Sequence, residues 1–282
     1  MHALAQLPQD RPAGPRRVAL SMYDLPGLQW ANDRLWAAVR GRLEAAGLSD
    51  LPQALDRESP VGEVWTDPGL LLAQTCGYPF VKQLSRRVRL VATPRYRAEG
   101  CRGPFHSSVV IVRAEERAQG LAGVKGARLA LNDEASGSGM NLLRAAVAPL
   151  AGGQPFFGTV AVTGSHLASI RAVATGHADV AAIDAVTWAH VGRLEPDLIS
   201  GLRPLAWTSS SPGLPLITAG DVDEPTLAAL QGALDDAAHD PSLVDVRQAL
   251  LLDGFSLLRE PHYHAVLHLE QRAIDLGYPR LC

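Results

Sequence analysis

The chain has 282 residues, of which 47% are hydrophobic and 20% charged, as in ordinary globular proteins. This composition excludes a disordered chain and a membrane protein, and the length suffices for two modest lobes or one large α/β domain. The net charge of −3, without a Lys/Arg block, argues against nucleic-acid binding.

The first elements predict alternating strands and helices. Residues 1–15 lack an apolar signal-peptide core, so we expect a disordered leader and, for the chain as written, a cytoplasmic location; a longer start carrying a signal would make it periplasmic. A strand is predicted at 17–22, and apolar residues at helical spacing predict a helix over 30–46, stopped by Gly47. Strands at 70–75 and 88–92, with a helix opening at 77–79 between them, indicate β-α-β units and a largely parallel sheet.

The alternation repeats in the second part of the chain. Strands are predicted at 107–112, 127–131, 159–162, 179–183 and 202–207, with helices from about Met140, over 164–174 and near Asp184, and mostly helix from Glu224 onward. Extended segments near 93–108 and 205–216 are expected to cross between two lobes. We therefore assign 16–105 and 210–282 to lobe 1 and 106–209 to lobe 2, with a binding cleft between them. No internal repeat and no membrane-spanning apolar run occurs, so no membrane insertion is expected.

A Ser/Gly loop, Asn132 to Gly139, lies between a predicted strand and a predicted helix. Glycines allow close approach of the backbone, while hydroxyls and the unpaired N–H groups of a helix start favour an anion. The loop therefore predicts an anion cradle at Ser136, Gly137 and Ser138. It lacks the Walker A and dinucleotide spacings. The alternative is a helix N-cap with a flexible turn.

Other polar side chains also follow predicted strands. His166 lies at a strand-to-helix junction and could donate to an anion, the alternative being a surface or capping residue. Asp184 could accept a hydrogen bond from a protonated ligand oxygen or an amine, or cap a helix. In the first unit, the hydroxyls of Tyr23, Thr75 and Tyr78 are expected to face the same crevice, because ligands of open α/β sheets bind beyond the carboxyl ends of strands.

In these stretches the sequence resembles the phosphate-, phosphite- and phosphonate-binding proteins of ABC transporters. The matching blocks are Asn132-Asp133 with Ser136-Gly137-Ser138-Gly139, then Thr163 to Ser169 with Ala172-Val173 and Gly176, then Ala178 to Asp184. Their order and spacing match too, and the resemblance extends from about residue 17 to residue 260. It implies a two-lobed α/β fold of the type II periplasmic-binding-protein kind, with two crossover segments.

The resemblance also implies a function and its residues. A small phosphorus oxyanion (phosphate, phosphite or a phosphonate) would be held by Ser136, Ser138 and His166, with Tyr23, Thr75 or Tyr78 closing on it and Asp184 reading protonation or an amino group. Family members often carry a Tyr before the strand that opens the second lobe; here Phe105-His106-Ser107-Ser108 stands there, so we expect His106 to replace it, beside Ser108. An ABC permease would be the partner, and the secretion signal and lipoprotein Cys expected of a transporter component are missing from the sequence as written. A cytoplasmic protein that senses or sequesters the ligand is the other possibility.

Three further interpretations compete with an oxyanion-binding protein. Ser136 or Ser138 with His166 and Asp184 superficially forms a Ser/His/Asp set, which would suit an enzyme acting on a small phosphorylated or carboxylated substrate, but no Gly-x-Ser-x-Gly elbow is present. His264 and His268 share a helix face without a further ligand, and the odd cysteines Cys76, Cys101 and Cys282 have no CxxC spacing. A regulatory effector domain would need a helix-turn-helix that the sequence lacks. We expect no catalysis, no metal and no cofactor.

Overall fold

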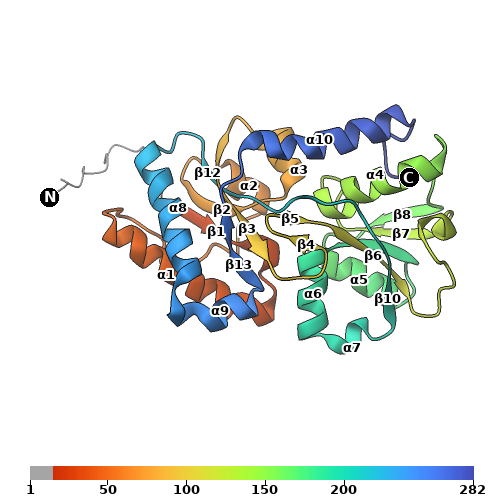
Figure 1. Cartoon of the computed structure of the whole chain (residues 1–282), viewed down its shortest axis with the longest axis horizontal. Coiled ribbons are helices and arrows are strands. Elements are labelled where there is room, and N and C mark those ends of the chain that lie inside the picture. Colours follow the sequence, from red (N-terminus) through yellow and green to blue (C-terminus); the bar gives the residue numbers. More distant parts are fainter. Residues whose placement is uncertain (1–14) are drawn as a thin grey trace. The chain divides into compact units, whose positions relative to one another are not determined.

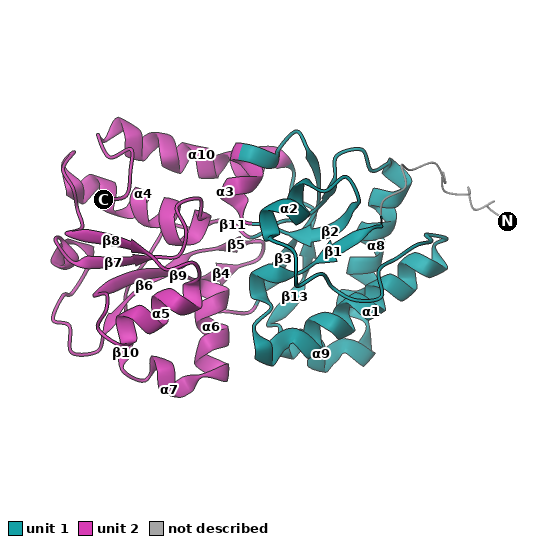
Figure 2. Cartoon of the chain, turned by 180° about the vertical axis from the view of Figure 1, so that it is seen from behind, with its two compact units in different colours: residues 1–75, 83–96, 214–259 teal, residues 76–82, 97–213, 260–282 magenta. Residues whose placement is uncertain are grey.

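The structure is a computed structural model that describes residues 15–282, and the chain divides into two compact units (Figures 1 and 2). Unit 1 comprises residues 1–75, 83–96 and 214–259, and unit 2 comprises residues 76–82, 97–213 and 260–282. The leader predicted at 1–15 lies outside the described residues apart from Pro15. The long connections between units fall at 96/97 and 213/214, within the extended segments predicted at 93–108 and 205–216.

Unit 1 is a five-stranded mixed sheet in the order β1-β2-β12-β3-β13. β1 runs parallel to β2, whereas β12 is antiparallel to β2 and β3, and β13 is antiparallel to β3. Every residue of β2 is buried, as expected for a central strand covered on both faces. Its strands and helices are β1 (Arg17–Ala19), η1 (Ser21–Tyr23), η2 (Pro26–Leu28), α1 (Gln29–Ala45), α2 (Val61–Thr66), β2 (Leu70–Gln74), β3 (Val88–Tyr96), β12 (Leu216–Ala219), α8 (Glu224–His239), η6 (Pro241–Leu243), α9 (Val244–Ala249) and β13 (Leu252–Ser256).

Unit 2 is built on a five-stranded sheet in the order β10-β6-β9-β7-β8. β7 is parallel to β8 and β9, whereas β6 is antiparallel to β9 and β10. A three-stranded sheet, β11-β5-β4, lies in the same unit. Its elements are α3 (Gly77–Pro79), which leads into η3 (Phe80–Leu84), β4 (Cys101–Arg102), β5 (Phe105–His106), β6 (Ser108–Arg113), η4 (Leu121–Val124), β7 (Arg128–Leu131), η5 (Gly137–Leu142), α4 (Leu143–Ala151), β8 (Thr159–Val162), α5 (His166–Ala174), β9 (Val180–Asp184), α6 (Ala185–Leu194), α7 (Pro196–Ile199), β10 (Leu202–Trp207), β11 (Ser211–Pro212) and α10 (Glu260–Asp275).

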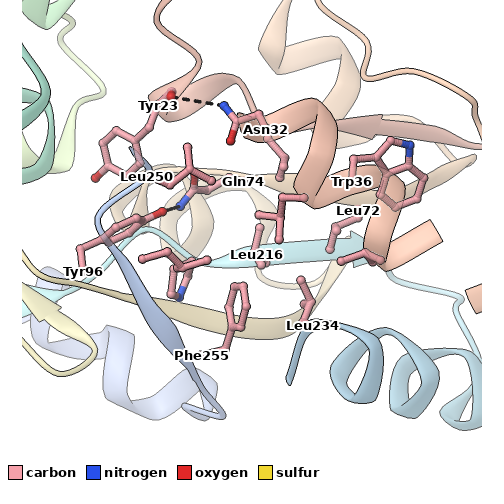
Figure 3. A pocket seen from close by; sticks show the side chains of 15 residues that line it. Tyr23, Asn32, Trp36, Leu72, Gln74, Tyr96, Leu216, Leu234, Leu250 and Phe255 are labelled. Atoms are coloured by element: carbon pink, nitrogen blue, oxygen red, sulfur yellow. Dashed lines mark hydrogen bonds between the residues drawn. The ribbon is translucent and has the colours of Figure 1, made fainter. Parts of the chain in front are cut away.

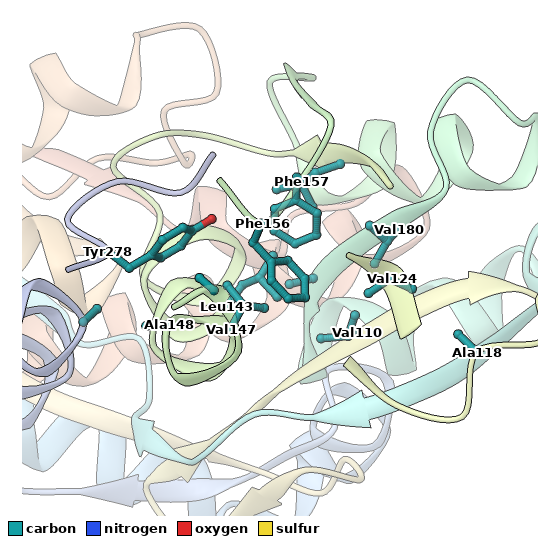
Figure 4. Close-up of a cluster of buried hydrophobic side chains, with 14 of the residues drawn as sticks. Val110, Ala118, Val124, Leu143, Val147, Ala148, Phe156, Phe157, Val180 and Tyr278 are labelled. Atoms are coloured by element: carbon teal, nitrogen blue, oxygen red, sulfur yellow. The ribbon is translucent and has the colours of Figure 1, made fainter. Parts of the chain in front are cut away.

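The core of unit 2 fixes the helix that follows the Ser/Gly loop. Leu143 and Val147 of α4 are fully buried against Val110 and Val180 of the sheet, and Phe156 packs edge-to-face on Phe157 with ring centroids 4.9 Å apart (Figure 4). Burying an aliphatic side chain of this size stabilises a fold by about 1.5–3 kcal/mol. The start of this helix is therefore held firmly against the sheet.

Several details differ from the sequence prediction. The sheet of unit 1, which we expected to be largely parallel, is mixed, because β12 and β13 run antiparallel to their neighbours. The helix expected from about Met140 begins at Gly137, as the π-helix η5 that continues into α4. Residues 252–256 form strand β13 rather than helix, because they pair with β3. Residues 76–82, 97–105, 210–213 and 260–282, which we expected in lobe 1, belong to unit 2. For 260–282 the reason is that α10 contacts α3, α4, η5 and β11.

No helix between residues 15 and 282 is both long and apolar enough to cross a bilayer.

Candidate functional site

One edge of the unit 2 sheet collects most of the predicted residues. β7, β8 and β9 run in the same direction, so their carboxyl ends lie at one edge, and antiparallel β6 brings its amino end there. Ser108, the first residue of β6, is the register partner of Asp184, the last residue of β9. The loop after β7 carries Ser136 and Ser138, and His166 begins α5 after β8.

The two serines of the loop have different tasks. Ser136 Oγ accepts a hydrogen bond from the Gly139 N–H at 2.9 Å, so Ser136 is the N-cap of η5. Ser138 Oγ lies 2.9 Å from His166 Nε2, and the Ser138 carbonyl accepts the Ser108 hydroxyl at 2.9 Å. Ser136, Ser138 and Ser108 are all buried. Ser138 therefore joins the helix start to α5 and to β6.

Close approach of neighbouring groups explains the glycines of this loop. A Cβ on Gly139 would lie 1.8 Å from Asn132 Oδ1, and one on Gly137 would lie 2.9 Å from Cys76 Sγ. The Gly137 N–H donates to Cys76 Sγ at 3.1 Å, so the amides of both Gly137 and Gly139 at the helix start already have acceptors. Burial raises the pKa of the Cys76 thiol, although hydrogen bonds from neighbouring backbone N–H groups act to lower it. No role was predicted for Cys76 from the sequence; its place two residues after the end of β2 is the signal that could have indicated one.

His166 is uncharged near neutral pH. Burial lowers its pKa to about 4, the charge of His106 lowers it too, and Asp184 and the Ala182 backbone oppose the shift. Ser165, the N-cap of α5, accepts the Ala168 N–H at 3.1 Å and so fixes the start of the helix that carries His166. A neutral imidazole and a hydroxyl in contact form a pair that can rearrange its hydrogens toward an incoming oxygen.

Asp184 and His106 form a second pair of side chains at this edge of the sheet, besides Ser138 and His166. Asp184 Oδ1 accepts the N–H groups of Val186 at 2.9 Å and Thr187 at 3.0 Å, which makes Asp184 the N-cap of α6. Its Oδ2 lies 2.7 Å from His106 Nδ1, and both side chains are buried. Burial alone would raise the pKa of Asp184, but the charge and hydrogen bond of His106, then His166 and the Thr187 N–H, outweigh it and lower the pKa to about 2. The carboxylate is thus ionised and engaged inside unit 2.

Tyr78 directs its hydroxyl elsewhere. The hydroxyl donates to Glu270 Oε1 of α10 at 2.6 Å, and Lys82 contacts Glu270 Oε2 at 3.0 Å. Arg144 of α4 lies 3.5 Å from the same carboxylate. The Tyr78 hydroxyl therefore ties α3 to α10. The predicted ligand contact of Tyr78 would have to replace this bond.

Tyr23 and Thr75 belong to unit 1, where Thr75 directly follows β2 and Tyr23 is the last residue of η1, because the strand predicted to reach residue 22 ends at Ala19. Tyr23 is buried and packs edge-to-face on Tyr96, with ring centroids 5.2 Å apart. Figure 3 shows Tyr23 and Tyr96 at one end of a largely apolar pocket inside unit 1, where Gln74 donates to the Tyr96 hydroxyl at 3.2 Å. Thr75 is fully buried and its N–H donates to the Pro215 carbonyl at 3.0 Å. Their contact with a ligand stays a prediction.

Residues 15–282 contain no group of three or more His, Cys, Asp and Glu side chains placed to hold a metal ion. His264 and His268 are exposed on α10.

The fold places the chain in a class. Three solved structures resemble it: a binding protein component of an ABC phosphonate transporter from Pseudomonas aeruginosa (14% identity, TM-score 0.74, covering 93% of this chain and 88% of that one), PhnD1 from Prochlorococcus marinus in complex with methylphosphonate (17%, 0.71, 92% and 98%), and a Xanthomonas citri protein bound to chloride (17%, 0.67, 93% and 99%). At these identities the likeness concerns the fold, and it confirms the predicted two-lobed α/β fold of substrate-binding proteins.

Residues 70–263 match the sequence model of a family described as the periplasmic substrate-binding proteins of phosphonate ABC transporters. The match spans more than half of the chain, which therefore belongs to this family, and the resemblance noted in the sequence is confirmed. Members of the family are substrate-binding components of a transporter. No curated protein matches the chain.

Proposed function

We propose that the chain binds a small phosphorus oxyanion (phosphate, phosphite or a small phosphonate) at the edge of the unit 2 sheet. The observation that carries this proposal is the contact of 2.9 Å between Ser138 Oγ and His166 Nε2 at the start of η5, beside a buried His106–Asp184 pair. Hydroxyl, imidazole and helix-start amides are donors suited to an anion, and the helix dipole adds partial positive charge.

The energetics favour oxyanions because a hydrogen bond to a charged group contributes about 1.5–3 kcal/mol. Removing one such donor should then weaken binding by about tenfold or more. An oxygen that inserts at Ser138 replaces the internal Ser138–His166 contact, so the two side chains change partner rather than lose one.

Calorimetry of purified protein with phosphate, phosphite and methylphosphonate tests the site. We expect Ser138→Ala and His166→Ala each to lower affinity for the best of these ligands by about tenfold or more, with an unchanged far-UV spectrum. Ser200→Ala, at the exposed end of α7, and His239→Ala, at an exposed position of α8, are the matched controls. Unchanged affinity in both site variants, or no binding of any of the three ligands, would reject the proposal.

The predicted contacts of Tyr23 and Thr75 are tested in the same titrations. Tyr23→Phe removes only the hydroxyl and keeps the ring that packs on Tyr96. Thr75→Val removes only the hydroxyl of a fully buried side chain. A ligand contact predicts weaker binding at unchanged melting temperature. A role confined to packing predicts unchanged affinity and a lower melting temperature.

We also propose that the protein does no chemistry on its ligand. A Ser/His/Asp triad needs a carboxylate that orients the base. Asp184 Oδ2 instead lies 2.7 Å from His106 Nδ1, and Oδ1 caps α6, so the geometry of this carboxylate is set by His106 and α6. We expect no turnover of chromogenic carboxyl or phosphate esters above background; turnover that Ser138→Ala abolishes would establish the alternative, an enzyme.

Transport follows from family membership, and we propose an ABC permease as partner and the periplasm as the location. Uptake of labelled methylphosphonate by spheroplasts of the source cells should rise when the purified protein is added back, and Ser138→Ala should not restore it. Fractionation of intact cells distinguishes a periplasmic transporter component from a cytoplasmic protein that senses or sequesters the ligand.

A further inference from the structure

The buried carboxylate of Asp184 has an unusual position in this protein. It is 1% exposed, and it is the only Asp or Glu among the buried residues between positions 15 and 282, although the side chain of Asp24 is also only 8% exposed. One oxygen caps α6 through the N–H groups of Val186 and Thr187, and the other lies 2.7 Å from His106 Nδ1. The carboxylate is therefore engaged on both sides before any ligand arrives.

His106 faces this carboxylate with its Nδ1. Because Asp184 is ionised, its Oδ2 can accept a hydrogen bond from the facing Nδ1 of His106. His106 lies two residues before Ser108, whose hydroxyl donates to the Ser138 carbonyl. Contacts thus run without a break from His166 through Ser138 and Ser108 to the strand pair that holds Asp184 and His106.

Resting on the oxyanion site proposed above, we infer that Asp184 is a positioning residue for His106 and that the ligand is a phosphorus oxyanion without an amino group. An ammonium group needs an acceptor, and a buried ammonium without one is strongly disfavoured. Asp184 already accepts a hydrogen bond from α6 and lies against His106. The two carboxylates of the Ser/Gly loop, Asp133 and Glu134, are exposed to water. The neighbouring His106 and His166 offer an amine no negative charge.

A pair of ligands that differ by one amino group tests the inference. Calorimetry should give an affinity for ethylphosphonate that is about tenfold or more above that for 2-aminoethylphosphonate. Equal or tighter binding of the amino compound would overturn the inference and leave the oxyanion site standing. Absence of binding by phosphate, phosphite, methylphosphonate and ethylphosphonate alike would overturn the proposed function and the inference together.

The positioning role is tested with Asp184→Asn, because the amide oxygen of Asn can still cap α6. We expect about tenfold weaker binding of ethylphosphonate, and a change in the ¹⁵N signals of His106 from the Nδ1–H form. Asp223→Asn, at the N-cap of α8 in unit 1, is the matched control and should change neither. Unchanged ethylphosphonate affinity in Asp184→Asn, with loss confined to the amino compound, would show that Asp184 contacts an amine instead.

A double variant shows whether Asp184 acts through His106. If it does, His106→Gln alone and His106→Gln combined with Asp184→Asn should lower the affinity for ethylphosphonate by a similar factor. Losses that multiply would overturn the positioning role.

Discussion

Acid should destabilise unit 2 through its buried histidines, and His166 allows the size of the effect to be worked out. Its pKa is lowered from 6.5 to about 4, chiefly by burial, and burial likewise lowers the pKa of His190 to about 4. The unfolded chain binds these protons more tightly than the folded one, so stability falls as the pH drops from about 6.5 toward 4. Between about pH 7.5 and pH 4.5 the loss is about 2.5 kcal/mol for each histidine.

Urea unfolding at these two pH values measures the effect. His166→Gln should reduce the pH dependence of the free energy of unfolding by about 2.5 kcal/mol, and His166→Gln with His190→Gln by about 5 kcal/mol. His239→Gln, at a side chain 72% exposed, should leave the pH dependence as in the wild type. A pH dependence in His166→Gln equal to that of the wild type would refute the reasoning, since it would mean that the folded protein accepts the proton as readily as the unfolded chain.

The remaining predictions concern the helix start, the link to α10 and a surface ion cluster. Gly139→Ala should cost about 1–3 kcal/mol and weaken ligand binding, because its Cβ would meet Asn132 Oδ1 at 1.8 Å; Gly41→Ala in α1, with nothing within 4 Å, should not destabilise the protein in the same thermal melts. Glu270→Gln should lower the urea midpoint, because it weakens bonds from Tyr78 and Lys82, whereas Glu224→Gln at a side chain 81% exposed should have little effect; equal shifts would contradict the assigned role of Glu270. Asp179, whose pKa Arg128 and Arg113 hold far below its usual value, contributes stability above about pH 3.8, so Asp179→Asn should destabilise near pH 7 and converge on the wild type in acid. If the difference in free energy of unfolding between the wild type and Asp179→Asn stayed constant down to about pH 2, it would contradict the pairing of the Asp179 carboxylate with the two arginines.

Local patterns were enough to predict the elements whose own residues decide their structure. The apolar spacing of 30–46 predicted α1, found at Gln29–Ala45, and Gly47 ends it with φ +91°. The unbroken apolar runs of β6 and β9 are buried at every position except Arg113. Both kinds of signal depend on neighbours within one or two turns, which the sequence displays directly.

Long-range partners decided the elements that were missed. Residues 252–256 form a strand only because β3 lies beside them, where Arg95 reaches the Phe255 carbonyl at 2.6 Å and Gly254 takes φ +109°. The π-helical start at Gly137 depends on Asn132 and Cys76, which approach the glycines too closely for side chains. Cys76 and β3 lie far along the chain from the segments they contact, so no local pattern could indicate them.

In the candidate site, too, the position of the residues could be predicted from the sequence, whereas their hydrogen-bond partners could not. The rule that polar residues follow strand ends predicted that Ser138, His166 and Asp184 gather at one edge of the sheet, because the parallel course of β7, β8 and β9 fixes where those ends meet. The rule could not say which partner each side chain takes. That Tyr78 turns to Glu270, and Asp184 to His106, follows from the packing of α10 and β5, which are far away along the chain.

For the oxyanion site proposed above, the burial that destabilises unit 2 in acid also limits the freedom of the side chains at the sheet edge. Ser138 is held by both its hydroxyl and its carbonyl, and His166 by the hydroxyl it contacts, so little side-chain freedom remains to be lost when an oxygen arrives. In the water-poor surroundings that lower the pKa of His166, a hydrogen bond to a charged oxygen is stronger than in water. An imidazole left in solvent would keep its proton more easily and cost less stability, but it would give a weaker and less directed contact. The proposed oxyanion site therefore predicts that acid sensitivity and ligand affinity share one cause, the burial of the His166 ring nitrogen Nδ1.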